Sequence, residues 1–154
     1  MPRHTDRTPP LRGGRVGNKV LIVDDSLCAR ILATRALRPE FEVLEAIDGP
    51  DALKKLTSEI SCVLCDLSMP CMNGLEFLAA ARVSRTTLPP VLMLTAYGEH
   101  VARDPRARDL GVHGWIQKPV DPKSLLSTVQ GLVYGAHESG RSAPTHLSSS
   151  QWLE

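Results

Sequence analysis

Residues 62–78 read CVLCDLSMPCMNGLEFL, and this stretch decides the fold class. Its first four residues are apolar without alternation, which is typical of a strand covered on both faces in a parallel sheet. The run ends at Asp66, and Pro70 stiffens the loop that follows, while Gly74 permits a backbone shape that a Cβ atom would oppose. Apolar residues then recur at helical spacing. The stretch therefore predicts a strand, a loop and a helix.

The same alternation of strand and helix continues in both directions. Further apolar runs lie at 20–23, 41–45, 91–94 and 115–117. Ser26 is a suitable N-cap for a helix after the first run. One side of that helix carries Leu27, Ile31 and Leu32, and the last helix opens at Pro122. Five strand–helix units in a row predict an α/β fold with a doubly wound parallel sheet.

Composition bounds the organisation of the chain. Its 154 residues suffice for one ordinary domain, which we expect at 18–134. Residues 1–17, rich in Pro, Gly and Arg, are expected to form a disordered basic tail, and 135–154 a flexible Ser-rich one. The net charge of +1 gives no reason to expect nucleic acid as a partner. The sequence shows no secretory signal, membrane-length apolar run or disulfide framework, so we expect a cytoplasmic protein without membrane contact.

The Cys62-x-x-Cys65 spacing has two interpretations. In a thioredoxin-like site the thiols lie where a strand turns into a helix. Here both cysteines lie inside a predicted strand, where residues three apart point to opposite faces. The spacing therefore favours two core residues.

Polar residues follow four of the five predicted strands. They are Asp24 with Asp25, then Asp66, Thr95 and Lys118. Each one alone has an ordinary explanation as a cap, a turn residue or a solvated charge. Ligands of open parallel sheets bind beyond the carboxyl ends of the strands, so the four strand ends together predict a site.

The residue types at these strand ends suit phosphoryl chemistry. Three crowded carboxylates repel each other unless a cation joins them, and hard oxygen ligands favour Mg²⁺ or Ca²⁺. Mg²⁺ typically combines one or two carboxylates with phosphate oxygens, and an ammonium and a hydroxyl can hold the remaining oxygens. Phosphoryl transfer needs mainly positioning and charge neutralisation, and an aspartate can accept the group. We therefore predict an aspartyl phosphorylation site.

Four motifs resemble the receiver domain of two-component response regulators. They are LIVDDS at 21–26, CDLSMPCMNGLEFL at 65–78, VLMLTAYG at 91–98 and GVHGWIQKPVD at 111–121. The resemblance covers about residues 19–134. It implies a flavodoxin-like sheet of five parallel strands in the order 2-1-3-4-5.

The resemblance also implies roles for the site residues. Asp66 would be the phosphoacceptor, and Mg²⁺ would be bound by Asp24, Asp25, Asp66 and the main-chain carbonyl of Ser68. Thr95 would bond a phosphoryl oxygen. These roles are expectations from the family pattern.

Lys118 would pair with the phosphoryl group, or with Asp66 before phosphorylation, and the Lys118–Pro119 bond is implied to be cis. Trp115 stands where the family usually has a switching Tyr or Phe, and both an inward-swinging and a permanently outward ring are compatible with the sequence.

Further positions bear on phosphoryl lifetime and on the partner surface. In the family, lifetime depends on the positions two after the phosphoacceptor and two after the threonine, here Ser68 and Tyr97. We hypothesise that Tyr97 screens water and slows self-hydrolysis. Asn73 replaces a more familiar Asp and is expected to matter little. Pro105 predicts a short helix starting near it.

We expect a stand-alone regulator that signals by protein contact, because the segment after the last predicted helix is too short for a DNA-binding or enzymatic domain. It would receive its phosphoryl group from a sensor histidine kinase or a histidine phosphotransfer protein and act on a downstream protein that the sequence does not identify. It would not be an enzyme beyond its own phosphorylation and dephosphorylation. Two alternatives are a phosphate-independent adaptor and an aspartyl-phosphate phosphohydrolase. A phosphohydrolase of this kind requires a second acid two positions after the nucleophile, where this chain has Ser68.

Overall fold

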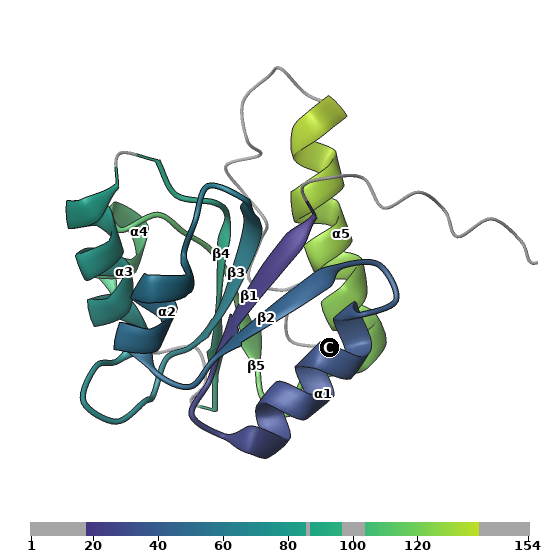
Figure 1. Ribbon diagram of the computed structural model, residues 1–154, viewed down its shortest axis with the longest axis horizontal. Helices are drawn as coiled ribbons and strands as arrows, with labels where there is room; N and C mark the ends of the chain where they lie inside the picture. The colour runs from purple at the N-terminus through teal and green to yellow at the C-terminus, as the bar shows by residue number, and fades with distance from the viewer. Residues whose placement is uncertain (1–17, 86, 97–103, 139–154) are drawn as a thin grey trace, which may run out of the picture.

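The computed structural model describes residues 18–85, 87–96 and 104–138, in which strands and helices alternate (Figure 1). The strands are β1 (Lys19–Val23), β2 (Glu42–Ala46), β3 (Ile60–Asp66), β4 (Val91–Thr95) and β5 (Val112–Gln117). The helices are α1 (Leu27–Leu37), α2 (Gly49–Lys55), α3 (Gly74–Ser84), α4 (Pro105–Asp109) and α5 (Pro122–Glu138). The predicted α/β class is confirmed.

The five strands form one parallel sheet in the order β2-β1-β3-β4-β5, which confirms the expected topology. Strand β2 lies on one side of β1, and the chain then crosses to form β3 on the other side of β1. The direction of winding therefore reverses between β1 and β3, which is where open sheets of this kind bind ligands.

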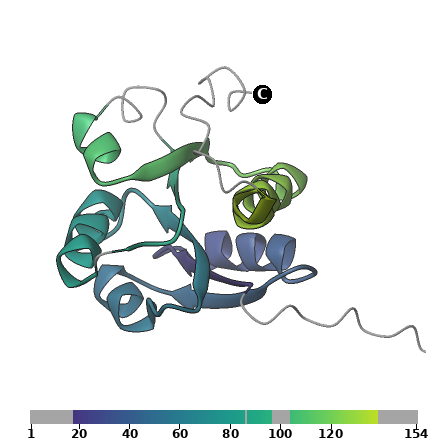
Figure 2. The same cartoon turned by 90° about the horizontal axis from the view of Figure 1, so that it is seen from above.

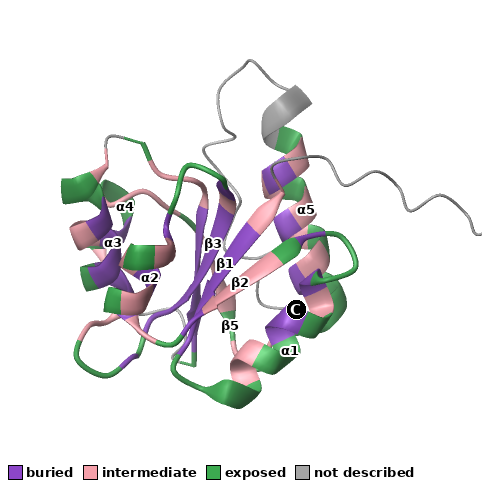
Figure 3. Ribbon diagram, viewed as in Figure 1, coloured by how far each residue is buried: buried purple, intermediate pink, exposed green. Residues whose placement is uncertain are grey.

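Two apolar cores lie on opposite faces of the sheet. The first packs against α2, α3 and α4, and the second against α1 and α5 (Figure 2). Residues of β1 alternate between them. Leu21 and Val23 belong to the first core, and Val20 and Ile22 to the second. Because both faces are covered, the central strands are buried along their length, as the colouring of Figure 3 shows.

The two cysteines of β3 divide between the cores. Cys62 lies in the second core and Cys65 in the first, and both are fully buried. Burial raises the pKa of the Cys62 thiol to about 12. Burial, and then the charge of Asp66, raise the pKa of Cys65 far above its usual range. Neither thiol forms a thiolate readily, so the interpretation as core residues is confirmed.

Side-chain caps fix where the helices begin. The Ser26 hydroxyl accepts a hydrogen bond from the Ala29 N–H (3.3 Å), so the predicted N-cap is confirmed. At α3, the Asn73 side chain accepts from the Glu76 N–H and the Glu76 carboxylate accepts from the Asn73 N–H, both at 2.8 Å. This capping box shows that an amide suffices at position 73.

Helix α1 exposes three large apolar side chains to solvent. Leu27 is 59% exposed, Ile31 38% and Leu32 61%. The residues that it buries are Ala33, Thr34 and Leu37. The apolar stripe noted in the sequence therefore faces away from the core.

Some element ends differ from the sequence-based expectation. Strand β5 begins at Val112, before the apolar run at 115–117, and α5 continues to Glu138, past the expected domain boundary at 134. Helix α4 begins at Pro105 as predicted. Residues 1–17, where we expect a tail, lie outside the described residues. No helix in the described part of the chain is long and apolar enough to cross a membrane.

Candidate functional site

The sheet brings the predicted residues to its carboxyl edge. Val23 lies opposite Cys65 in the β1–β3 register, so Asp24 and Asp66 are neighbours at the ends of these strands. On the other side, Lys118 follows β5, and its N–H donates to the Thr95 carbonyl at 2.8 Å. The rim thus unites four strand ends that are far apart in sequence.

Three carboxylates form the centre of the site. Oxygens of Asp24, Asp25 and Asp66 all lie within 4.8 Å of one another. Asp24 and Asp66 are buried, at 1% and 6% exposure, whereas Asp25 is exposed. The arrangement offers hard oxygen donors from three side chains with one open side, and this donor set fits a divalent cation such as Mg²⁺.

Lys118 supplies a positive charge to the same cluster. Its Nζ atom donates to Asp24 Oδ2 at 2.7 Å and lies 3.4 Å from Asp66 Oδ2. Burial opposes the charged ammonium, but the hydrogen bond and charge of Asp24, followed by the charge of Asp66, outweigh it and raise the pKa of Lys118. The expected contact with Asp66 exists, but the closer partner is Asp24, which the sequence did not predict. The Lys118–Pro119 bond is cis, as the resemblance implied.

Asp66 has an unusual proton affinity. Burial, and then the charge of Asp24, raise its pKa to about 6, although Lys118 and the Ser68 N–H act in the opposite direction. At neutral pH the group is still mostly a carboxylate. Asp66 is therefore a carboxylate held in a partly desolvated position.

The loop after Asp66 is tightly constrained. The Ser68 N–H donates to Asp66 Oδ1 at 3.3 Å, and the Gly74 N–H donates to the Leu67 carbonyl at 2.8 Å. A Cβ atom on Gly74 would lie 2.7 Å from the Asp66 carbonyl oxygen, so only glycine allows this approach. Cys71 has a φ of 68°, a left-handed conformation that is rare outside glycine.

Three further residues were predicted for the site, namely Thr95, Tyr97 and Trp115. Thr95 is buried at the end of β4. Tyr97 lies outside the described residues. Trp115 is half-buried on β5 opposite Met93 and packs against the first core.

Sequence reasoning missed Arg30, one helical turn beyond the acidic pair. Its Nη1 atom donates to the main-chain carbonyl of Asp24 at 2.8 Å, although its side chain comes from α1. The only sequence signal was a basic residue in the first turns of a helix that begins at the site. Such a residue is usually a solvated charge, so this signal is weak.

Fold and site together define the class of protein. It is a doubly wound α/β domain whose strand ends carry a lysine and a cluster of three carboxylates able to hold a divalent cation. The family model described as "Response regulator receiver domain" matches residues 20–130. The chain belongs to this receiver domain family, as the motifs indicated.

Relatives of known sequence support this assignment. The chain is 35% identical over 123 residues to the transcriptional regulatory protein CpxR of Escherichia coli (strain K12), covering 79% of this chain and 52% of that protein. It is 32% identical over 120 residues to the transcriptional regulatory protein SrrA of Staphylococcus aureus (strain NCTC 8325 / PS 47), covering 77% of this chain and 48% of that protein. The chain thus spans about half the length of these curated relatives.

Solved structures give the same result. The Vibrio cholerae chemotaxis protein CheY4 is similar with a TM-score of 0.68 and 36% identity, covering 75% of this chain and 98% of that one. A CheY-like receiver domain protein from Methanospirillum hungatei JF-1 has a TM-score of 0.70 and 27% identity, covering 80% and 98%.

Proposed function

We propose that this receiver domain is a phosphorylation switch whose acceptor is Asp66. The observation that carries the proposal is the setting of that carboxylate, buried between Asp24 and Lys118 and next to the exposed Asp25. In the proposed step, an Asp66 oxygen attacks the phosphorus of a phosphohistidine. The O–P bond forms as the P–N bond breaks, and the imidazole nitrogen keeps the electron pair and takes up a proton.

Mg²⁺ is the proposed cofactor. Asp24, Asp25 and Asp66 would hold it together with the main-chain carbonyl of Ser68. When bound, it neutralises charge on the carboxylates and on the incoming phosphoryl oxygens.

The chain's own residues then position the phosphoryl group. Lys118 already bridges Asp24 and Asp66, and its ammonium can move to a phosphoryl oxygen once that group carries the negative charge. We assign the Thr95 hydroxyl to a second phosphoryl oxygen. Ser68 and Tyr97 would tune the lifetime of the acyl phosphate, with Tyr97 excluding water. The protein would catalyse only its own phosphorylation and dephosphorylation.

The proposed donor is a sensor histidine kinase or a histidine phosphotransfer protein. Membership of the family implies such a partner. Helix α1 begins beside the site and exposes Leu27 and Leu32 by 59% and 61%, which suits contact with another protein surface. The output would be phosphorylation-dependent contact with a downstream protein rather than with nucleic acid, in the cytoplasm.

The proposal is tested by intact-mass measurement after incubation with acetyl phosphate. The wild type should gain one phosphoryl group with Mg²⁺ and none with EDTA, and Asp66→Asn should gain none in either. Asp109→Asn, at an exposed position of α4, is the matched control and should label like the wild type. No gain in the wild type, where a known receiver domain is labelled in parallel, would favour a phosphate-independent adaptor.

A further inference from the structure

Arg30 lies directly behind the acidic cluster. Its side chain is only 11% exposed, which is unusual for an arginine. Its Nη1 atom donates to the Asp24 carbonyl at 2.8 Å, and its Nε atom lies 3.4 Å from Glu45 Oε2. One guanidinium therefore joins the end of β1 to strand β2.

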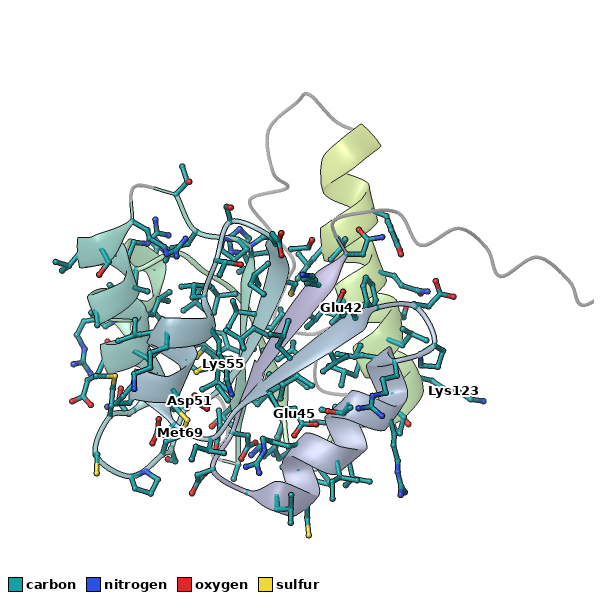
Figure 4. The ribbon with its side chains drawn as sticks, viewed as in Figure 1. Glu42, Glu45, Asp51, Lys55, Met69 and Lys123 are labelled. Atoms are coloured by element: carbon teal, nitrogen blue, oxygen red, sulfur yellow. The ribbon has the colours of Figure 1, made fainter. Side chains whose placement is uncertain are left out.

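Glu45 is itself braced. Its other carboxylate oxygen, Oε1, accepts a hydrogen bond from the hydroxyl of buried Thr34 at 2.7 Å. Figure 4 shows Glu45 on β2 where that strand passes α1. In the sheet it pairs with Ile22, two residues before Asp24. The side chains of Thr34, Glu45 and Arg30 thus form a chain from α1 to β2 and on to the Asp24 carbonyl.

This carbonyl belongs to the peptide that joins the two acidic residues. Because a peptide unit is planar, fixing the Asp24 carbonyl also fixes the direction in which Asp25 leaves it. The Asp24 N–H donates to Ala46 at 3.1 Å, and Asp24 Oδ1 accepts from the Ser26 N–H at 2.9 Å. These two bonds hold the main chain before that peptide and the Asp24 side chain, whereas Arg30 holds the carbonyl of the peptide itself from outside the carboxylate cluster.

We infer that Arg30 is a positioning residue for the divalent-cation site, with Glu45 and Thr34 as its brace. The inference rests on the metal site of the proposed function. Arg30 would orient Asp24 and Asp25 toward the cation without binding it.

A positioning role and simple electrostatics predict opposite changes in Mg²⁺ affinity when Arg30 is removed. Arg30 is a cation near a site that binds a cation, so charge alone would make Mg²⁺ bind more tightly when Arg30 is removed. Loss of positioning would make it bind more weakly. The two effects can therefore be told apart by the direction of the change.

The test is a calorimetric titration of Mg²⁺ into the full chain. Arg30→Met should weaken binding by about 10-fold, the lower end of what loss of an outer-shell partner costs. Arg30→Lys keeps the charge but cannot bridge both partners, so it should also bind more weakly than the wild type. Arg35→Met, on the exposed side of the same helix, removes an equal charge and should change the affinity less than about twofold.

A second variant avoids any change of charge. Thr34→Val removes the hydroxyl that holds Glu45 while conserving side-chain shape. A positioning role predicts weaker Mg²⁺ binding in this variant. Electrostatics alone predicts no change in the affinity, because the charge of the protein is the same. Circular dichroism of each variant before titration establishes that it is folded.

The outcomes separate this inference from the proposed function. Binding by Arg30→Met that equals or exceeds the wild type, or unchanged binding by Thr34→Val, overturns the positioning role even if Asp66 is phosphorylated. A wild type that binds Mg²⁺ but is never phosphorylated overturns the proposed function, and the comparison of affinities still stands. A wild type that binds no Mg²⁺ overturns both.

Discussion

At the scale of single residues, Asp66 lies in an environment that disfavours its charge. Burial and the neighbouring Asp24 raise its pKa to about 6, so a proton binds the folded chain more tightly than the unfolded one. The stability gained from that proton is present below the ordinary pKa of an aspartate, about 4, and is lost as the pH rises through about 6. An aspartate kept charged in this environment costs stability at neutral pH.

Asp66→Asn should therefore stabilise the protein in the absence of Mg²⁺. The neutral amide avoids the cost of a buried charge, and Lys118 retains its closer partner Asp24 at 2.7 Å. We expect a gain in the free energy of unfolding of about 1–3 kcal/mol near pH 7.5, shrinking toward zero near pH 4. Urea unfolding in EDTA at both pH values measures it. A variant less stable than the wild type at neutral pH would show that the carboxylate contributes net stability.

At the scale of elements, the loop from β3 to α3 stores strain at Cys71. The side chain is exposed, yet its φ is 68°, in the left-handed region where a Cβ atom is unfavourable. The loop is held at both sides, by the Ser68 N–H on Asp66 and by Gly74 against the Asp66 carbonyl. The backbone at Cys71 therefore follows from the constraints around it rather than from its own preference.

Cys71→Gly should relieve this strain, whereas Cys71→Val should increase it. Glycine adopts positive φ freely but loses more backbone entropy on folding, so the net gain is between zero and about 1 kcal/mol. A β-branched side chain is a poorer fit, and the valine variant should be less stable than the glycine variant by about 1–2 kcal/mol. Thermal unfolding of the two variants decides the matter, since equal melting temperatures would mean that position 71 is not strained in solution.

Helices and strands differ in how far the sequence predicted them. The buried strands were recognisable because their apolar runs face a core on both sides. The exposed face of α1 was not recognisable, because Leu27 and Leu32 resemble core residues in the sequence. The residues that the helix buries are Ala33, Thr34 and Leu37, of which the first two look unremarkable.

At the scale of the whole molecule, topology assembles a site from four separate strand ends. This was predictable, because parallel strands place their carboxyl ends on one edge and Asp66 ends such a strand. The hydrogen-bond partners of Lys118 and Arg30 were not predictable. Both side chains are long and contact residues of other elements, so the distances to their partners depend on tertiary packing. Trp115 is a similar case, because its half-buried position depends on how β5 lies against the first core.

The topology also implies selectivity. In the described part of the chain, Asp24, Asp25 and Asp66 are the one group of three potential metal ligands that gather within 4.8 Å. Of these, only Asp66 lies on β3 with its loop folded over it. We therefore predict that Asp66 alone accepts the phosphoryl group, although the chain contains many other carboxylates and hydroxyls.

The most direct measurement is the position of the phosphoryl group. Protein labelled with acetyl phosphate and Mg²⁺ is treated with borohydride, which reduces an aspartyl phosphate to homoserine, and is then digested for peptide mass spectrometry. If Asp66 is the phosphoacceptor, homoserine appears at position 66 and at no other position. Reduction at another aspartate, or a labelled chain in which residue 66 is still aspartate, would contradict it.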